Sequence, residues 1–341
     1  MSNPACTDIS VIIPVYNRTV ALERLLLALL SQDIGCDRFE VLLCDDGSTE
    51  DYIPVLRRMT RLGLKIIYLR QENAGPGAAR NLGLAHASGE IIAFTDSDCV
   101  PNSRWLSTIV RIFEENGVGI VGGHVGFGSH SRLSSQCGNY LMSSSIGAAG
   151  ARAPTCLISM KYQPRTCNMA VRRQLALRAG GFTNRRYGED IEFSHKVHSL
   201  GVACRYSAKM SVDHHENRGL LGVLRESFNK GVARIYLKKK YGLHQPIHAA
   251  PALFVACLAI TLCLLRLSLV MFWTPYLLLV GITALCGAFY IRDWRAIGVI
   301  PILCVLMHMG YGTGYLFAVT ASLRTANRLP KRKPAYAHDG P

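Results

Sequence analysis

Two aspartates in this 341-residue sequence have a spacing that suits metal chemistry. Asp96 and Asp98 stand two positions apart, directly after the apolar run 90–95. An extended backbone places alternate side chains on the same side, so both carboxylates could bind one hard divalent cation such as Mg²⁺ or Mn²⁺. Such a cation neutralises negative charge that develops on a leaving diphosphate. The alternative is that Asp98 or Ser97 simply caps a helix N-terminus.

Three further polar clusters also follow apolar runs in the N-terminal half. They are Tyr16–Arg18, Asp45–Ser48 and Asn73–Asn81. A lone Asp-Gly-Ser is more often a turn than a site. In an open α/β sheet, however, ligands bind outside the carboxyl ends of the strands. Four polar clusters in succession are hard to explain as turns, and we expect them to meet at one edge of a sheet.

Strand and helix patterns alternate along the part of the chain that carries these clusters. We expect strands over 9–15, 39–44, 64–69 and 90–95, separated by helices over 20–30, 50–61 and 77–87. This alternation is typical of a parallel sheet covered on both faces. Further along, we expect strands over 118–127, 168–172 and 203–212, helices over 105–115, 189–200 and 219–241, and a long loop over 129–164.

The C-terminal third has the composition of a membrane region. Residues 248–323 include only four charged side chains among 76. We expect about three membrane spans, over 251–272, 274–291 and 296–323. Basic residues flank this region on both sides, from Lys238 to Lys240 and in the tail 324–341. We therefore assign the net charge of +15 to an anionic membrane surface and not to nucleic acid.

The expected span count conflicts with the basic flanks. Three spans would place the tail on the opposite side from the N-terminal domain, whereas the positive-inside rule requires an even number. One segment is therefore expected to be re-entrant or interfacial, and Gly310–Gly314 is the candidate. The twelve cysteines lack a CxxC pair or framework spacing, which indicates reduced thiols in a cytosolic setting and gives no support for zinc.

Several stretches together resemble the inverting glycosyltransferases of family 2, over about residues 8–240. The resemblance implies an α/β GT-A fold, which is Rossmann-like and binds a nucleotide-diphosphate sugar, followed here by C-terminal transmembrane helices. It also implies a divalent metal and inversion at the anomeric carbon. The matching stretches are SVIIPVYNR (Ser10–Arg18), DDGS (Asp45–Ser48), NAGPGAARN (Asn73–Asn81), GEIIAFTDSD (Gly89–Asp98), CNMAVR (Cys167–Arg172) and GEDIE (Gly188–Glu192).

The resemblance assigns donor-binding roles to residues of all four clusters. It places Pro14, Tyr16 and Asn17 at the border of the nucleotide base. Asp46, with Asp45 beside it, is expected to hydrogen-bond the base. The remaining donor-side residues are Arg80, near the nucleotide, Asp96, at the ribose and metal, and Asp98, at the metal.

Asp190 matches the family's catalytic base, with Glu189 beside it in the substrate site. A carboxylate there would take the proton from an acceptor hydroxyl as its oxygen attacks C1. The alternative is that both acids favour the first turn of a helix through its dipole, and the two interpretations are compatible. The resemblance also places a histidine at the metal or diphosphate. We favour His214 over His215, although a structural histidine pair is an equal alternative.

These features predict four regions. The nucleotide-sugar-binding half of the GT-A domain covers 1–125 and its acceptor-binding half covers 126–245. A transmembrane region covers 246–323, and a basic tail covers 324–341. The stretch His308–Tyr315 is similar to bacterial membrane-anchored exopolysaccharide glucosyltransferases.

No Gln-x-x-Arg-Trp motif follows Asp190, which favours the addition of one sugar per encounter. We expect a uridine-linked donor, a lipid-linked acceptor, and a catalytic domain on the cytoplasmic side of the bacterial inner (plasma) membrane. A processive polysaccharide synthase and a non-catalytic sugar-nucleotide scaffold are the alternatives.

Overall fold

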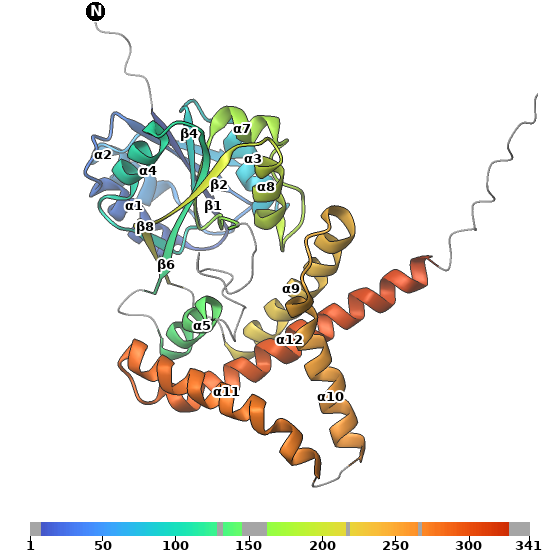
Figure 1. Cartoon of the computed structure of the whole chain (residues 1–341). Helices are drawn as coiled ribbons and strands as arrows, with labels where there is room; N and C mark the ends of the chain where they lie inside the picture. The colour runs from blue at the N-terminus through green and yellow to red at the C-terminus, as the bar shows by residue number, and fades with distance from the viewer. Residues whose placement is uncertain (1–7, 128–131, 145–161, 216–218, 265–267, 327–341) are drawn as a thin grey trace, which may run out of the picture. The chain divides into compact units, whose positions relative to one another are not determined.

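The computed structural model describes residues 8–127, 132–144, 162–215, 219–264 and 268–326. Its α/β domain contains an eight-stranded sheet in the order β3-β2-β1-β4-β7-β6-β8-β5 (Figure 1). The strands are β1 (Ile9–Val15), β2 (Phe39–Asp45), β3 (Ile66–Arg70), β4 (Ile91–Thr95), β5 (Cys99–Pro101), β6 (Val118–Gly126), β7 (Asn168–Arg172) and β8 (Ala203–His214). Strands β1 to β4 are mutually parallel, whereas β7 is antiparallel to both β4 and β6. The expected parallel sheet is confirmed for the N-terminal half.

Helices cover both faces of this sheet, which explains why its strands are continuously apolar (Figure 1). Successive residues of β1 point to opposite faces, and each face has its own core. Val11 packs with Ile9 and Ile13 on one face, while Ile12 packs with Phe94 on the other. The first face is covered by α1 (Thr19–Leu30), α2 (Ile53–Arg61) and α4 (Trp105–Glu114); the second by α3 (Pro76–His86), α7 (Arg173–Arg178) and α8 (Glu189–His198).

Three short elements were not expected from the sequence. One is β5, which has three residues, and another is α7, which has six. The third, α5 (Leu133–Ser143), lies inside the predicted loop 129–164, so the loop prediction is wrong there. Its buried apolar side chains, Cys137 and Leu141, are four positions apart among small and polar residues, which gives little helical periodicity. Residues 145–161 of the predicted loop lie outside the described residues.

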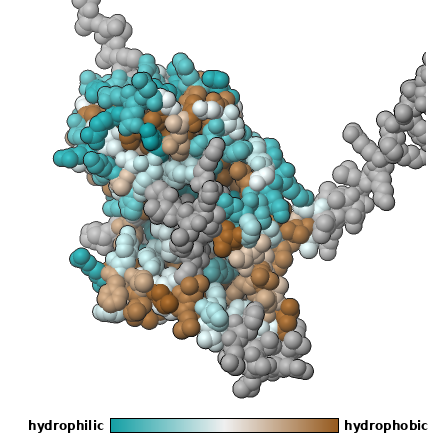
Figure 2. Space-filling view, in the orientation of Figure 1, coloured by the Kyte–Doolittle hydropathy of each residue, from teal (hydrophilic) through white to brown (hydrophobic). Residues whose placement is uncertain are grey.

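The C-terminal region is helical. It consists of α9 (Leu220–Tyr241), a short 3₁₀ turn at Pro246–Ala249, α10 (Ala250–Leu264), α11 (Ser268–Ile291) and α12 (Ala296–Ala326). Among the described residues, two helical segments are long and apolar enough to cross a membrane, Trp273–Ile291 and Ala296–Ser322, whereas Pro246–Leu262 is shorter. The structure thus supports two such helices where about three were expected. Figure 2 shows hydrophobic surface over these helices, in contrast to the mostly hydrophilic α/β domain.

The predicted re-entrant segment Gly310–Gly314 is instead part of the continuous helix α12, so that prediction is wrong. Its glycines lie where neighbouring backbones approach closely. A Cβ added at Gly310 would be 2.5 Å from the carbonyl oxygen of Leu224, and one at Gly314 would overlap that of Phe228. Small residues allow helices to pack this closely, so these glycines serve packing against α9.

By contacts, the chain divides into two compact units. The first lies within Met1–Leu220 and Val270–Val305, and the second within Leu221–Leu269 and Leu306–Pro341. The α/β domain belongs to the first unit, and α9, α10 and the later part of α12 belong to the second. The predicted basic tail lies almost wholly outside the described residues.

Candidate active site

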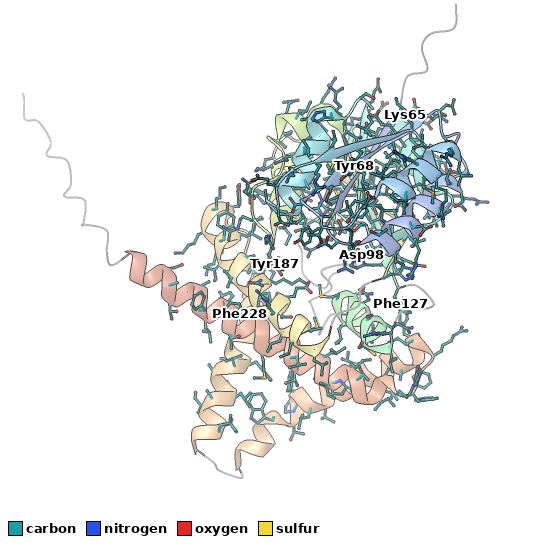
Figure 3. The ribbon with its side chains drawn as sticks, turned by 180° about the vertical axis from the view of Figure 1, so that it is seen from behind. Lys65, Tyr68, Asp98, Phe127, Tyr187 and Phe228 are labelled. Carbon is teal, nitrogen blue, oxygen red and sulfur yellow. The ribbon has the colours of Figure 1, made fainter. Side chains whose placement is uncertain are left out.

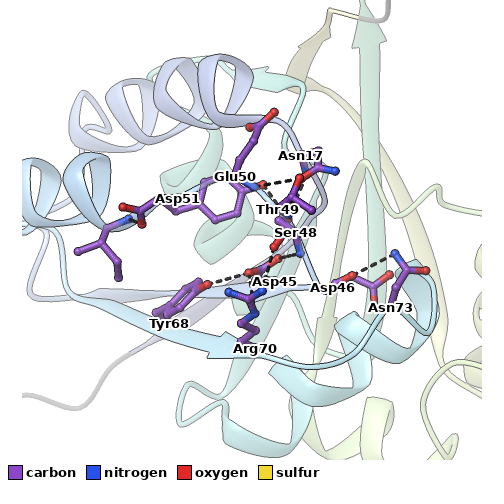
Figure 4. Close-up of polar contacts among 12 residues, drawn as sticks. Asn17, Asp45, Asp46, Ser48, Thr49, Glu50, Asp51, Tyr68, Arg70 and Asn73 are labelled. Carbon is purple, nitrogen blue, oxygen red and sulfur yellow. Dashed lines mark hydrogen bonds and ion pairs between the residues drawn. The ribbon is translucent and has the colours of Figure 1, made fainter.

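Asn17 connects the first polar cluster to the second at the carboxyl ends of β1 and β2. Its backbone has a φ of 51°, a left-handed conformation that Asn tolerates better than most residues. Its backbone N–H donates to Ser48 Oγ at 3.0 Å, and its side-chain oxygen accepts the N–H of Thr49 at 2.9 Å (Figure 4). The loops after β1 and β2 are therefore held together by side chains of both clusters.

Asp46 connects the second cluster to the third. Its carboxylate accepts hydrogen bonds from Gln71 Nε2 at 2.8 Å, from the N–H of Ala74 at 2.8 Å and from the N–H of Gly75 at 2.9 Å. Gly75 has a φ of 95°, which a residue with a side chain rarely adopts, at the start of α3. Asp46 thus organises the loop that leads into α3, and its predicted contact with a nucleotide base stays a prediction.

Asp45 is fully buried beside it. It accepts hydrogen bonds from the N–H of Ser48 at 2.8 Å and from the Tyr68 hydroxyl at 2.7 Å (Figure 4). Burial and the Asp45 carboxylate raise the pKa of Tyr68 to about 12, so the phenol stays a donor at neutral pH. The structure therefore gives Asp45 a role in shaping the turn, whatever it contributes to binding.

Pro14 and Tyr16 lie at the same end of β1. Pro14 is buried, and the pairing of β1 with β4 ends at Ile12, so the missing N–H of Pro14 leaves no gap in that ladder. The side chain of Tyr16 is about half exposed just after the strand. It is available to contact a planar ligand, as predicted for the nucleotide base.

Arg80 connects the third cluster to the fourth and to α8. The side chain is 3% exposed and donates from Nη2 to Asp96 at 2.7 Å and from Nη1 to Glu189 at 3.1 Å. Its guanidinium also lies over the Phe182 ring, 5.6 Å from the centroid. One buried cation therefore joins α3, the end of β4 and the start of α8. Losing one partner of such a buried pair typically costs about 3–5 kcal/mol.

Glu189 and Asp190 begin α8, after Gly188 in a left-handed conformation. Burial, with the neighbouring Asp190 charge, raises the pKa of Glu189 to about 7. Burial also acts to raise the pKa of Asp190, but an ion pair with Arg165 at 2.9 Å and the N–H of Ile191 at 2.8 Å outweigh it and lower that pKa. The pKa values of the two adjacent carboxyls are thus shifted in opposite directions, and Asp190 is ionised at neutral pH.

Arg165 is a candidate site residue that the sequence interpretation missed. It stands two positions before the matching stretch Cys167–Arg172, at the end of the predicted loop, where no periodicity marks it. The available signal was a basic residue three positions before the start of β7. Its partner lies 25 positions away, so only the fold reveals the pair.

Asp98 and His214 are brought together by the antiparallel pairing of β5 with β8, in which Cys99 lies opposite His214. The His214 Nε2 atom is 3.1 Å from Asp98 Oδ1. Asp98 lies at the edge of the α/β domain (Figure 3). Among the described residues, potential ligand atoms of Asp98, Cys99 and His214 lie within 4.8 Å of one another. Asp96 is not part of this group. Its carboxylate forms an ion pair with Arg80 at 2.7 Å, and its side chain is 30% exposed.

The donor chemistry of this group fits a divalent metal. Burial, with the neighbouring Cys167, raises the pKa of the Cys99 thiol well above its ordinary range, so the thiol is protonated when no metal is bound. A carboxylate and an imidazole remain, which suit Mn²⁺ or a similar ion. His215 donates its backbone N–H to the Asp98 carbonyl oxygen at 2.8 Å, and its side chain interacts electrostatically with Asp213. His214 is therefore the histidine whose side chain meets Asp98.

The raised pKa of Glu189 predicts a pH-dependent stability. Since the folded protein holds a proton on Glu189 up to about pH 7 and the unfolded chain releases it near 4.5, stability falls as pH rises through this window. The loss should be on the order of 2 kcal/mol. Glu189→Gln should flatten the fall of the melting temperature between pH 5 and 8, measured on metal-free protein in detergent. Exposed Glu72→Gln is the control and should follow wild type; parallel curves for both variants would disprove the assignment.

The sheet order, the helices on both faces and the acidic residues at the ends of parallel strands define a GT-A glycosyltransferase fold. The mannosyltransferase PcManGT from Pyrobaculum calidifontis, in complex with GDP-Man and Mn²⁺, superimposes with a TM-score of 0.60 at 20% identity, covering 89% of this chain and 86% of that chain. Staphylococcus aureus TarS 1–349 in complex with UDP gives 0.52 at 17% identity, covering 97% and 94%. Both likenesses concern the fold.

Sequence comparisons identify the family of the N-terminal domain. The model of glycosyl transferase family 2 matches residues 10–173. The glycosyltransferase AglE of Haloferax volcanii is 29% identical over 235 residues, which is 67% of this chain and 73% of AglE. The poly(ribitol-phosphate) β-N-acetylglucosaminyltransferase TarS of Staphylococcus aureus is 35% identical over 108 residues, which is 31% of this chain and only 19% of TarS. Residues 10–173 form a glycosyl transferase family 2 domain, and the chain is a glycosyltransferase.

Proposed function

We propose that this chain is an inverting glycosyltransferase that moves a sugar from a uridine-diphosphate sugar to a lipid-linked saccharide at a membrane. The observation that carries the proposal is the single hydrogen-bonded set formed by Arg80, Asp96 and Glu189, with Asp190 next in sequence. Complexes of TarS with UDP and with UDP-GlcNAc support a uridine donor, whereas PcManGT is described with GDP-Man. Both nucleotides therefore belong in the test.

In this proposal Asp190 is the catalytic base. It takes the proton from the acceptor hydroxyl as the oxygen attacks C1 from the face opposite the diphosphate, so a single displacement inverts the centre. Arg165 keeps the carboxylate ionised. Each carboxylate oxygen has two lone pairs, so the bonds from Arg165 and Ile191 leave capacity for the incoming proton.

The donor would lie along the carboxyl ends of β1, β2 and β4. Tyr16 and Pro14 would border the base, with Asn17 holding their loop. A carboxylate has about four lone-pair sites, and Asp46 uses three of them for its own loop, which leaves one for the base. Asp45 would hold the turn that follows Asp46 through its bond from Ser48, and Asp96 would contact the ribose.

A divalent metal, Mn²⁺ or Mg²⁺, would be held by Asp98 and His214, with Asp96 close by. When bound it neutralises the diphosphate as charge develops on it. The imidazole of His214 favours Mn²⁺, because Mg²⁺ prefers an all-oxygen shell. The Mn²⁺ in the PcManGT complex is consistent with this choice.

Membrane attachment by α11 and α12 completes the proposal. Only 28% and 39% of their most apolar windows are buried, unlike the core helix of a soluble protein. Two crossings also remove the conflict with the positive-inside rule, since both basic flanks then lie on the same cytoplasmic side. The acceptor would reach the active site from the bacterial inner (plasma) membrane. The region boundaries at 125, 245 and 323 are part of this proposal.

The test uses the purified full chain in detergent with Mn²⁺, a panel of UDP- and GDP-sugars and an extract of membrane lipids, with products identified by mass. One sugar added to a lipid-linked acceptor, lost on chelation of the metal, is the expected result. A long polymer would establish the processive synthase instead. Donor binding without transfer or hydrolysis over a broad acceptor panel would establish the non-catalytic scaffold.

A further inference from the structure

A group of polar side chains lies within the second unit, where α9 meets α10 and α12. We call it the Arg234 cluster: Arg234 of α9, His244 and His248 of the segment before α10, and Tyr311 and Tyr315 of α12. The Tyr315 hydroxyl is 2.9 Å from His244 Nε2, and the two histidine rings are 5.5 Å apart. The cluster therefore joins three segments of the chain, and none of it belongs to the active site described above.

A hydrogen bond sets the tautomer of His248, and burial keeps its ring neutral. The backbone N–H of Gln245 donates to His248 Nδ1 at 2.9 Å, so in the neutral ring Nε2 carries the proton and is a donor. Burial, with the charge of Arg234 nearby, lowers the pKa of His248 to about 3. The ring is therefore neutral when no anion is present, and Arg234 is the charged member of the cluster.

The Arg234 guanidinium has a donor without an acceptor among the described residues. Within the described residues its Nη1 is buried and makes no hydrogen bond, and the Tyr311 hydroxyl lies beside the same guanidinium. A buried cationic donor without a partner is costly, which makes an acceptor from outside favourable.

The described residues from 219 onward provide no carboxylate that lacks a basic partner. Between residues 219 and 338 the sequence contains two acids, Glu226 and Asp293. Glu226 pairs with Lys230 at 2.6 Å, and Asp293 pairs with Arg295 at 2.7 Å. Both acids of this stretch are therefore already paired, and we take the acceptor for Arg234 to be an anion from another molecule.

The neighbourhood indicates what kind of molecule. α10 and α12 expose large apolar side chains such as Leu253, Leu316 and Phe317, and α12 is one of the two helices that could cross a membrane. Arginine, tyrosine and an imidazole N–H are all donors to phosphate oxygens. We propose that the Arg234 cluster binds the phosphate group of a membrane lipid. The inference rests on the membrane attachment in the proposed function, but not on the sugar donor or on the reaction.

Native mass spectrometry of the full chain in dodecyl maltoside tests this with dioleoylphosphatidic acid as the probe. Dioleoylglycerol, which has the same chains without phosphate, and inorganic phosphate are the comparison ligands. Wild type should retain phosphatidic acid at least about tenfold more tightly than either, and Arg234→Gln should lose about tenfold. The matched control is Arg225→Gln, an exposed arginine of the same helix, which should change retention less than about twofold.

Equal retention by wild type and Arg234→Gln would overturn the proposal. So would equal losses in the two arginine variants, or binding of inorganic phosphate as tight as that of the lipid. If Arg234→Gln does not fold, judged by its melting temperature, Tyr311→Phe removes one donor at constant shape and should weaken retention about threefold; unchanged retention would again overturn the proposal. Because the assay contains no sugar nucleotide, its failure is distinguishable from failure of glycosyl transfer.

Discussion

Asp190→Asn is expected to lower the rate of sugar transfer about 10²- to 10⁴-fold, because the amide cannot accept a proton at neutral pH. Donor binding should stay within a few-fold of wild type, since the shape of the side chain is unchanged. The amide oxygen can still accept a hydrogen bond from Arg165, so the start of α8 should persist. The measurement is initial transfer rate at saturating donor and acceptor, together with donor affinity by calorimetry.

Glu192→Gln is the matched control for this prediction. Glu192 is also buried in the first turn of α8, and its carboxylate accepts a hydrogen bond from Thr183 at 2.8 Å, which an amide oxygen can also accept. This variant should keep its rate within a few-fold. Full turnover by Asp190→Asn, or an equal loss in Glu192→Gln, would remove Asp190 from the role of base.

The ion pair with Arg165 provides a companion prediction about pH. Arg165→Gln removes the charge that outweighs the burial of Asp190, so the pKa of Asp190 should rise. The base must be ionised to act, so the acid limb of kcat/KM should move to higher pH, and the loss at pH 6 should exceed the loss at pH 8. A uniform loss across the profile would indicate that Arg165 is only structural.

Asp98→Ala should also abolish most of the activity. It removes a predicted metal ligand and leaves His214 without its carboxylate partner at 3.1 Å. Loss of residues that merely orient ligands already costs about 10–100-fold, so transfer should fall by at least about 100-fold. Donor binding should also lose its dependence on Mn²⁺, measured by calorimetry with and without chelator.

The two adjacent histidines provide the control for the metal site. His214→Ala should weaken metal-dependent donor binding, because its imidazole meets Asp98. His215→Ala should change it little, because His215 reaches Asp98 through its backbone N–H, which alanine keeps. Equal effects of the two substitutions would contradict the assignment of His214. Donor binding by Asp98→Ala that still depends on Mn²⁺ would place the metal elsewhere.

Some features of the sheet were predictable because their causes are local. A strand buried on both faces must be apolar at nearly every position, and Ile9–Val15 and Phe39–Asp45 are buried along their whole length. A helix with a weak apolar pattern gives no such signal, which is why α5 was missed. The glycines of α12 were misinterpreted for a related reason: their close approach to α9 depends on a neighbour that the sequence does not show.

The family, the parallel half of the sheet and the order of the four polar clusters could be read from the sequence alone, because strand periodicity and short motifs are properties of neighbouring residues. Which side chains of those clusters meet became known only from the tertiary structure. Arg80 contacts Glu189 across 109 positions, and His214 contacts Asp98 across 116. The first pair forms because α3 and α8 pack on the same face of the sheet, and the second because β5 pairs with β8. The same long-range contacts set the opposite pKa shifts of Glu189 and Asp190, since burial and partner charges exist only in the folded chain.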